Sequence, residues 1–195
     1  MMRIVGGRFR GKHLLSPSDD SIRPTADRVR QSIFDIVSAR LGQSLDGLRV
    51  LDLFAGTGAM GLEALSRGAA SVVFVDTGVE ARGLIRDHIE AFGAGGMTKL
   101  LRRDATALGA AGTMGPVDLV FLDPPYGQGL GEKALAALRD GGWLRPTTLL
   151  LLEEAREAVV EMPDGFALED RREYGAAAVY VLSAFARTSA PDLTS

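Results

Sequence analysis

From residue 48 onward, short apolar runs alternate with stretches whose apolar residues recur at helical spacing. The predicted strands are residues 49–54, 71–75, 99–102, 117–122 and 148–152. The predicted helices lie near residues 59–67, 79–92 and 131–140, and an apolar stripe at residues 29–41 predicts one more helix ahead of them. Apolar strands that alternate with helices are typical of a parallel sheet covered on both faces. We therefore predict an α/β fold with a doubly wound, mostly parallel sheet.

The last part of the chain departs from this alternation. Residues 167–173 and 177–185 are two extended runs joined near Tyr174 and Gly175, which predicts an antiparallel hairpin. A parallel sheet closed by such a hairpin distinguishes class I S-adenosylmethionine-dependent methyltransferases from dinucleotide-binding Rossmann folds. The pattern therefore predicts the Rossmann-like sheet of class I methyltransferases.

Residues 1–22 precede this fold and have a different pattern. Within them, residues 3–5 and 9–15 flank glycines and predict a short β-hairpin arm. We place the main domain at residues 23–187 and expect residues 188–195, which are polar and include a proline, to form a disordered tail.

The composition is that of one ordinary soluble domain. The chain has 195 residues, of which 46% are apolar and 24% are charged. No apolar run approaches the roughly 20 residues that a membrane span requires, and the first residues lack the pattern of a signal peptide. There are no cysteines for disulfides or thiolate metal sites. We expect a cytoplasmic monomer without membrane partners.

Charge is distributed unevenly along the chain. Residues 1–40 hold eight Lys and Arg against four Asp, a net charge of +4, whereas the whole chain carries −3 and the remaining residues therefore carry −7. An arginine-rich arm on an acidic body suits a protein that docks on phosphates through one segment. A solvated basic surface without a partner would give the same pattern.

A glycine-rich loop follows the first predicted strand. Gly56, Gly58 and Gly61 have the Gly-x-Gly-x-x-Gly spacing that both dinucleotide and S-adenosylmethionine sites use. Asp52, four residues ahead of the first glycine, favours the second ligand. A carboxylate there would repel a pyrophosphate, whereas it attracts a sulfonium and an ammonium group.

Two further acids follow the next strands. Asp76 ends the second strand, where a carboxylate can accept hydrogen bonds from the ribose hydroxyls of an adenosyl group. Asp104 follows the third strand and is expected either to accept from the adenine amino group or to cap a helix. The candidate cofactor contacts are Asp52, Phe54, Gly56, Gly58, Gly61, Asp76 and Asp104.

The fourth strand ends in the tetrapeptide Asp123, Pro124, Pro125 and Tyr126, which we take as the candidate catalytic residues. The exocyclic amine of a nucleic-acid base is a poor nucleophile, because its lone pair is conjugated into the ring. The Asp123 carboxylate and the Pro124 carbonyl can each accept one N–H and so orient the nitrogen. The Tyr126 ring can stack on a base swung out of its helix. A turn after a buried strand also favours these residue types, but the order of glycine loop and tetrapeptide is that of an amino-methyltransferase.

With these motifs in place, the sequence resembles the bacterial RsmD family over nearly its whole length. The resemblance lies in residues 3–12, 23–34, 51–61, 123–126 and 173–175. It implies methyl transfer from S-adenosylmethionine, without a metal, to the N2 amino group of one guanine in 16S ribosomal RNA. It also implies that the substrate is a small ribosomal subunit that already carries ribosomal proteins.

Residues 23–34 form the family's most distinctive stretch, which is implied to line the active site beside the cofactor and to meet RNA. With the basic start of the chain, the candidate nucleic-acid contacts are Arg8, Arg10, Lys12, Arg23, Thr25, Arg28 and Arg30. We interpret His13 and His88 as surface or packing residues, because methylation of an amine needs no histidine base.

Three other interpretations share parts of this pattern: a methyltransferase with another acceptor, a catalytically silent module and a dehydrogenase. Similar tetrapeptides serve adenine-N6 and cytosine-N4 DNA methyltransferases and glutamine-N5 protein methyltransferases, although DNA enzymes usually add a target-recognition region for which 195 residues leave little room. A catalytically silent RNA-binding module would keep the fold, but the intact Asp123 and glycine loop argue against it. A dehydrogenase is disfavoured by Asp52.

Overall fold

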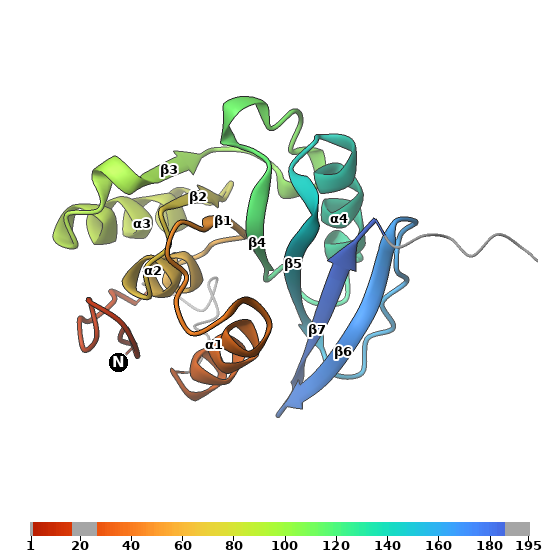
Figure 1. The fold of residues 1–195 in the computed structure, drawn as a ribbon, viewed down its shortest axis with the longest axis horizontal. Coiled ribbons are helices and arrows are strands. Elements are labelled where there is room, and N and C mark those ends of the chain that lie inside the picture. The colour runs from red at the N-terminus through yellow and green to blue at the C-terminus, as the bar shows by residue number, and fades with distance from the viewer. Residues whose placement is uncertain (1, 17–26, 186–195) are drawn as a thin grey trace, which may run out of the picture.

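The structure, a computed structural model, describes residues 2–16 and 27–185. The strands are β1 (Arg49–Leu53), β2 (Ser71–Val75), β3 (Thr98–Leu101), β4 (Val117–Leu122), β5 (Leu144–Ala155), β6 (Phe166–Tyr174) and β7 (Ala177–Ala184). They form a seven-stranded sheet in the order β3-β2-β1-β4-β5-β7-β6 (Figure 1). The pairs from β3 to β5 are parallel, and β7 is antiparallel to both β5 and β6. The predicted class I methyltransferase sheet with its C-terminal hairpin is confirmed.

Several strand boundaries differ from the sequence prediction by a few residues, and two of these differences have a structural reason. β1 ends at Leu53, one residue early, because Phe54 has a φ of 57°, outside the range that a strand residue adopts. β5 begins at Leu144, earlier than predicted. Its pairing with β4 shifts register between Val117 and Leu119, so the added residues form an irregular stretch that apolar periodicity does not reveal.

Helices cover both faces of the sheet (Figure 1). They are α1 (Asp27–Leu41), α2 (Ala59–Ser66), α3 (Val79–Ala91) and α4 (Leu130–Asp140), with the short 3-10 helices η1 (Gly95–Met97), η2 (Ala105–Ala107) and η3 (Gly112–Met114). Helices α1, α2 and α3 pack in one apolar core, and α4 packs in a second core across the sheet. Successive strand residues point to opposite faces, so Val50 belongs to the first core and Leu51 to the second. In the described part of the chain, none of the helices combines the length and apolarity of a transmembrane span.

The N-terminal arm, which we define as residues 2–16, folds back on itself as predicted but forms a shorter hairpin than expected. One antiparallel bridge joins Arg3 to His13, and the Ile4 amide donates to the Lys12 carbonyl at 2.9 Å. No strand forms within these residues, because two successive turns occupy the middle of the arm. The expected boundary between arm and domain and the expected C-terminal tail lie outside the described residues.

The carboxylate of Glu63 on α2 holds the arm against the domain. This side chain is 0% exposed and accepts hydrogen bonds from the backbone amides of Val5 (2.9 Å) and Gly6 (2.8 Å). The Nε atoms of Arg67 and Arg30 lie 2.9 Å and 3.4 Å from its oxygens. A fully buried carboxylate is tolerated only with such partners. The arm, α1 and α2 therefore meet at one buried charge cluster.

The prediction that Arg30 contacts RNA is wrong. Its side chain is 0% exposed, faces Glu63, and donates to the Arg3 carbonyl and to Asp27. It lies on the buried face of α1, where the Glu63 carboxylate needs a cation. A signal for this was present in the sequence, because Arg30 stands four residues before Phe34 and so falls on the apolar stripe of its helix.

We predict that Glu63→Ala lowers the free energy of unfolding by about 3–5 kcal/mol, because it removes the buried carboxylate that faces the Arg30 guanidinium. Urea denaturation measures the loss. Glu157→Ala is the matched control, since Glu157 pairs with Arg156 on the surface and is 82% exposed, and its removal should have little effect. Equal losses in the two variants would contradict the role of the buried cluster.

Candidate active site

The site lies where β1 and β4 end side by side. The two strands are parallel and paired in register through Leu53 and Leu122. The Asp123 amide then reaches the Leu53 carbonyl at 3.4 Å, which continues the pairing one residue further. Because the order of the strands reverses here, the segments that leave β1 and β4 diverge and open a crevice between them. The glycine loop and the Asp-Pro-Pro-Tyr tetrapeptide are those two segments.

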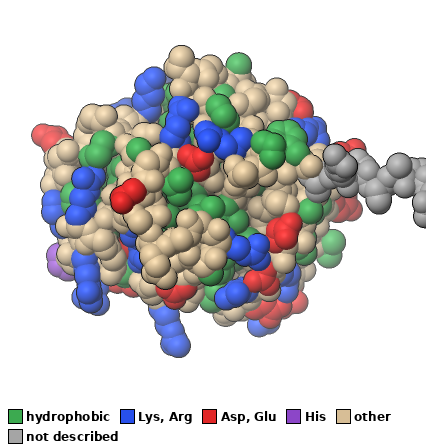
Figure 2. Space-filling view, viewed as in Figure 1, with side chains coloured by type: hydrophobic (Ala, Val, Ile, Leu, Met, Phe, Trp, Pro, Cys, Tyr) green, Lys and Arg blue, Asp and Glu red, His purple; other side chains and the backbone are tan. Residues whose placement is uncertain are grey.

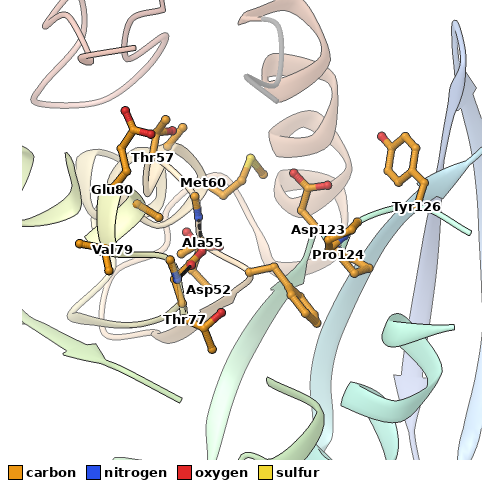
Figure 3. A pocket seen from close by; sticks show the side chains of 17 residues that line it. Asp52, Ala55, Thr57, Met60, Thr77, Val79, Glu80, Asp123, Pro124 and Tyr126 are labelled. Carbon is orange, nitrogen blue, oxygen red and sulfur yellow. Dashed lines mark hydrogen bonds between the residues drawn. The ribbon is translucent and has the colours of Figure 1, made fainter. Parts of the chain in front are cut away.

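A cavity of about 640 Å³ occupies this crevice, within the range of about 300–1,000 Å³ for small-molecule sites. Its lining residues are Asp52, Phe54, Ala55, Gly56, Thr57, Ala59, Met60, Asp76, Thr77, Gly78, Val79, Glu80, Ala81, Asp123, Pro124, Pro125 and Tyr126. Figure 3 shows Asp123 and Tyr126 on the side formed by the end of β4, across the cavity from Asp52 and Thr77. The predicted catalytic residues and most of the predicted cofactor contacts therefore share one cavity.

Two of the predicted glycines shape the loop without lining the cavity. Gly58 precedes α2 with a φ of 75°, a left-handed conformation that glycine adopts without strain. At Gly61 a Cβ would lie 2.4 Å from Cε1 of Phe74 on β2, so a side chain there would push α2 off the sheet. Their role is to let the helix start beside the strand and pack close to it.

Asp52 is a buried acid at the floor of the cavity. It is 2% exposed, and its Oδ2 accepts a hydrogen bond from the Gly61 amide at 2.9 Å. Burial raises the pKa of this carboxyl to about 8, the Gly61 hydrogen bond opposes the rise, and the negative charge of Asp76 adds to it. A cation in the cavity would favour the ionised form, because opposite charges attract strongly at a buried site.

The charge of the cavity selects among nucleotide-like ligands. Four carboxylate residues line it, namely Asp52, Asp76, Glu80 and Asp123, and none of the described lining residues is Lys or Arg. A pyrophosphate would be repelled by this lining, whereas a ligand with positive charge would relieve the cost of burying Asp52. The residues present therefore fit S-adenosylmethionine and do not fit a dinucleotide.

Asp76 and Asp104 have different surroundings. Asp76 lines the cavity, and its two oxygens accept hydrogen bonds from the amides of Gly56 (2.9 Å) and Gly78 (2.7 Å), which ties the glycine loop to the end of β2. Asp104 is exposed, lies outside the lining and caps η2 by accepting from the Thr106 amide at 2.8 Å. A hydrogen bond from the Thr106 hydroxyl at 2.7 Å, together with the one from its amide, lowers the pKa of Asp104. The cap is thus observed, and the contact with adenine stays a prediction.

Two acids at the end of β5 hold the tetrapeptide in place. Glu153 accepts a hydrogen bond from the Tyr126 hydroxyl, and buried Glu154 accepts one from the Gly127 amide at 2.9 Å. The sequence analysis does not predict this pair. The signal was present, because Glu153 and Glu154 follow a run of four leucines in the strand that neighbours β4, so they reach the same sheet edge as Asp123.

Several known proteins are similar to this chain in sequence. The model of a family described as conserved hypothetical protein 95 matches residues 2–183. The ribosomal RNA small subunit methyltransferase D of Escherichia coli (strain K12) is 33% identical over 175 residues, which cover 89% of this chain and 85% of that protein. The chain belongs to the RsmD family.

Two further similarities bear on this RsmD-family chain. A tRNA (guanine(6)-N2)-methyltransferase from Thermus thermophilus is 35% identical over 158 residues, which cover 72% of this chain and 44% of that protein. The solved structure of yhhF from Escherichia coli is 30% identical, with a TM-score of 0.79, and the match covers 95% of this chain and 99% of that one. The shared architecture therefore extends over nearly the whole chain.

The candidate RNA contacts of this RsmD-family protein fall into three groups. Arg8, Arg10, Lys12 and Arg28 are exposed, Arg30 is buried, and Arg23 and Thr25 lie outside the described residues. Figure 2 shows Lys and Arg side chains along the edge of the molecule where the arm lies in Figure 1. Arg8 and Lys12 both stack on the Phe9 ring, 4.6 Å and 5.0 Å from its centroid. An exposed cationic surface with an aromatic ring beneath it is compatible with contact to a nucleic-acid backbone.

We predict that Asp52→Asn flattens the pH dependence of stability. The unfolded carboxyl titrates near 3.8 and the folded one near 8, so the stability that the neutral buried group contributes is present in acid and is lost as the pH rises from about 4 to about 8. An asparagine cannot ionise and should show no such loss. Urea denaturation at about pH 5 and about pH 8 measures the slope.

The control for this experiment is Asp35→Asn, which replaces an exposed carboxyl on α1. It should keep the pH slope of the wild-type protein. An Asp52→Asn variant that loses as much stability between the two pH values as the wild type does would rule out Asp52 as the source of the slope.

Proposed function

We propose that this protein transfers a methyl group from S-adenosylmethionine to the N2 amino group of a guanine in the RNA of the small ribosomal subunit. The observation that carries the proposal is the cavity between β1 and β4. Asp52 lies on its glycine-loop side and Asp123 on its β4 side. Asp76 lines the glycine-loop side as well, since it accepts a hydrogen bond from the Gly56 amide. A cationic methyl donor and an amine acceptor therefore have separate sets of partners within one crevice.

The glycine-loop side would hold the methyl donor. S-adenosylmethionine supplies a methyl group activated by a sulfonium. Asp52 offers a buried carboxylate to the positive end of the ligand, and Asp76 keeps lone pairs for ribose hydroxyls beside its two backbone donors. The backbone of Gly56 lines the cavity and lets the ligand approach closely.

The β4 side would hold the base. Asp123 and the Pro124 carbonyl each accept one N–H of the exocyclic amine, which directs the nitrogen lone pair toward the methyl carbon. As the nitrogen–carbon bond forms and the carbon–sulfur bond breaks, positive charge grows on nitrogen and the Asp123 carboxylate stabilises it. The methylated amine then releases one proton to water. Pro124 is buried and the loop is tied to Glu153 and Glu154, so the two acceptors are held in place before the base arrives.

The choice of guanine and of the small subunit is supported by the relatives. The Escherichia coli relative is named for the RNA of the small ribosomal subunit, and the Thermus thermophilus relative is named for N2 methylation of a guanine in tRNA. The match to the first relative covers most of both chains, whereas the second is covered over less than half of its length. The exposed cations of the arm, Arg8, Arg10 and Lys12, suit the phosphates of a folded RNA.

We expect label from radioactive S-adenosylmethionine to enter small ribosomal subunits that lack the modification and to appear as N2-methylguanosine after digestion to nucleosides. Naked 16S RNA, total tRNA, DNA and a protein extract are tested in parallel. Label in naked RNA but not in assembled subunits would overturn the choice of the assembled particle. Label only in tRNA, in N6-methyladenine or in methylglutamine would overturn the proposed acceptor while leaving the methyl donor in place.

Mutations on the two sides of the cavity should affect different steps, catalysis on one side and binding of the methyl donor on the other. Asp123→Ala should lower kcat about 100-fold or more while the Kd of S-adenosylmethionine stays within about twofold, because Asp123 acts on the acceptor. Asp76→Ala should raise that Kd about tenfold, because it removes a charged hydrogen-bond acceptor. Calorimetry gives the Kd values, and single-turnover transfer gives the rate. Equal loss of donor affinity in the two variants would refute this division of roles.

A further inference from the structure

His88 joins the glycine loop to the N-terminal arm. It lies on the buried face of α3 and is 2% exposed. Its Nδ1 is 2.9 Å from the carbonyl oxygen of Thr57, which lines the cavity, and its Nε2 accepts the amide hydrogen of Leu15 at 2.7 Å. One imidazole ring therefore contacts the cofactor loop on one side and the end of the arm on the other.

Only one form of the ring can make both hydrogen bonds. The Thr57 carbonyl needs a donor, so Nδ1 must carry a hydrogen, and the Leu15 amide needs an acceptor, so Nε2 must not. The ring is thus the neutral Nδ1–H tautomer. Burial lowers the pKa of His88, which favours this neutral form against the opposing effects of the Thr57 carbonyl and of Asp87.

The surroundings of the ring tighten the same junction. The Phe92 ring lies 6.3 Å from the His88 ring and packs against Phe9 of the arm at 5.1 Å between centroids. Charged groups reach this junction from two elements: Asp87 on α3, and from the arm Lys12, whose Nζ lies 4.8 Å from the centre of the Phe92 ring. The glycine loop presents the Thr57 carbonyl. The arm is therefore packed on α3 next to the His88 hydrogen bonds.

We propose that His88 is a positioning residue that couples the N-terminal arm to the glycine loop, so that contact of the arm with RNA and binding of the methyl donor strengthen each other. The imidazole is rigid and planar, so a shift of Leu15 that turns the ring also moves the donor that holds Thr57. Fixing either end therefore restricts the other. This inference rests on the proposed function, because it takes RNA as the partner of the arm.

Two substitutions of His88 each remove one of its two hydrogen bonds and can keep the other. In His88→Asn the side-chain amide can replace the Nδ1 donor to Thr57 but does not extend to Leu15. In His88→Gln the longer side chain can place its oxygen near the Nε2 position and accept from Leu15, while the donor to Thr57 is lost. His13→Asn is the matched control, because His13 belongs to the arm and is exposed.

The decisive quantity is the Kd of S-adenosylhomocysteine measured with and without bound small ribosomal subunits that lack the modification. In the wild-type protein the subunits should lower this Kd about fivefold or more. In His88→Asn the ratio should fall to about one, while the Kd without subunits stays within about twofold of the wild type. In His88→Gln the ratio should also fall to about one, and the Kd of S-adenosylhomocysteine without subunits should rise as well. His13→Asn should keep the wild-type ratio.

Several results would overturn the inference. A residue that only stabilises the fold would lower the melting temperature in both variants but leave the ratio unchanged. A wild-type ratio near one would also refute the coupling. A second measurement needs no variant: the Leu15 amide should exchange its hydrogen more slowly when S-adenosylhomocysteine binds the wild-type protein, and an unchanged rate would contradict a link between loop and arm.

The outcomes separate this inference from the proposed function. If the wild-type protein methylates small subunits and the ratio does not depend on His88, the inference fails and the function stands. If the protein neither binds nor methylates small subunits, the proposed function fails, and hydrogen exchange at Leu15 still reports whether the cofactor loop and the arm are coupled.

Discussion

The pairing of β1 with β4 is the constraint on which the site depends. Residues more than sixty positions apart in sequence leave the sheet at the same edge, because Leu53 and Leu122 are partners in a parallel ladder. A slip of one residue would turn Asp52 away from the crevice and bring an apolar neighbour into its place, since adjacent strand residues face opposite sides. The apolar cores on the two faces fix this register, so the packing of the sheet also sets the chemistry of its edge.

Burying a carboxylate costs free energy, and the protein offsets this cost differently at Glu63 and at Asp52. The Glu63 carboxylate is stabilised within the protein by Arg30, Arg67 and the amides of Val5 and Gly6, so it contributes to the fold. Burial raises the pKa of Asp52 to about 8 and the negative charge of Asp76 adds to the rise, while the hydrogen bond from the Gly61 amide only partly opposes it. The charge of Glu63 is compensated within the fold by Arg30 and Arg67. At Asp52, part of the free-energy cost of burial remains and would be offset by a positively charged ligand in the cavity.

The sequence was most informative where the signal is local. The mostly parallel sheet followed from the alternation of elements. Part of the cavity lining followed from motifs such as Asp123 to Tyr126, which stand at strand ends. Contacts between segments that are distant in sequence were harder to predict. The residues next to Arg30 in sequence do not indicate Glu63, its partner in the fold. The partners of His88, Thr57 and Leu15, likewise come from other elements. Helical periodicity places such residues on a buried face but does not identify what they meet there.

The distribution of charge explains how one small chain can handle a cationic donor and an anionic polymer together. The cavity is lined by carboxylates, so RNA phosphates are repelled from it, whereas a neutral base can enter. The arm carries the exposed cations Arg8, Arg10 and Lys12, which would take up the phosphates at a distance from the donor. The negatively charged cavity and the positively charged arm must stay a fixed distance apart, so that each binds its own ligand. The anchoring of the arm through Glu63 and His88 provides that separation.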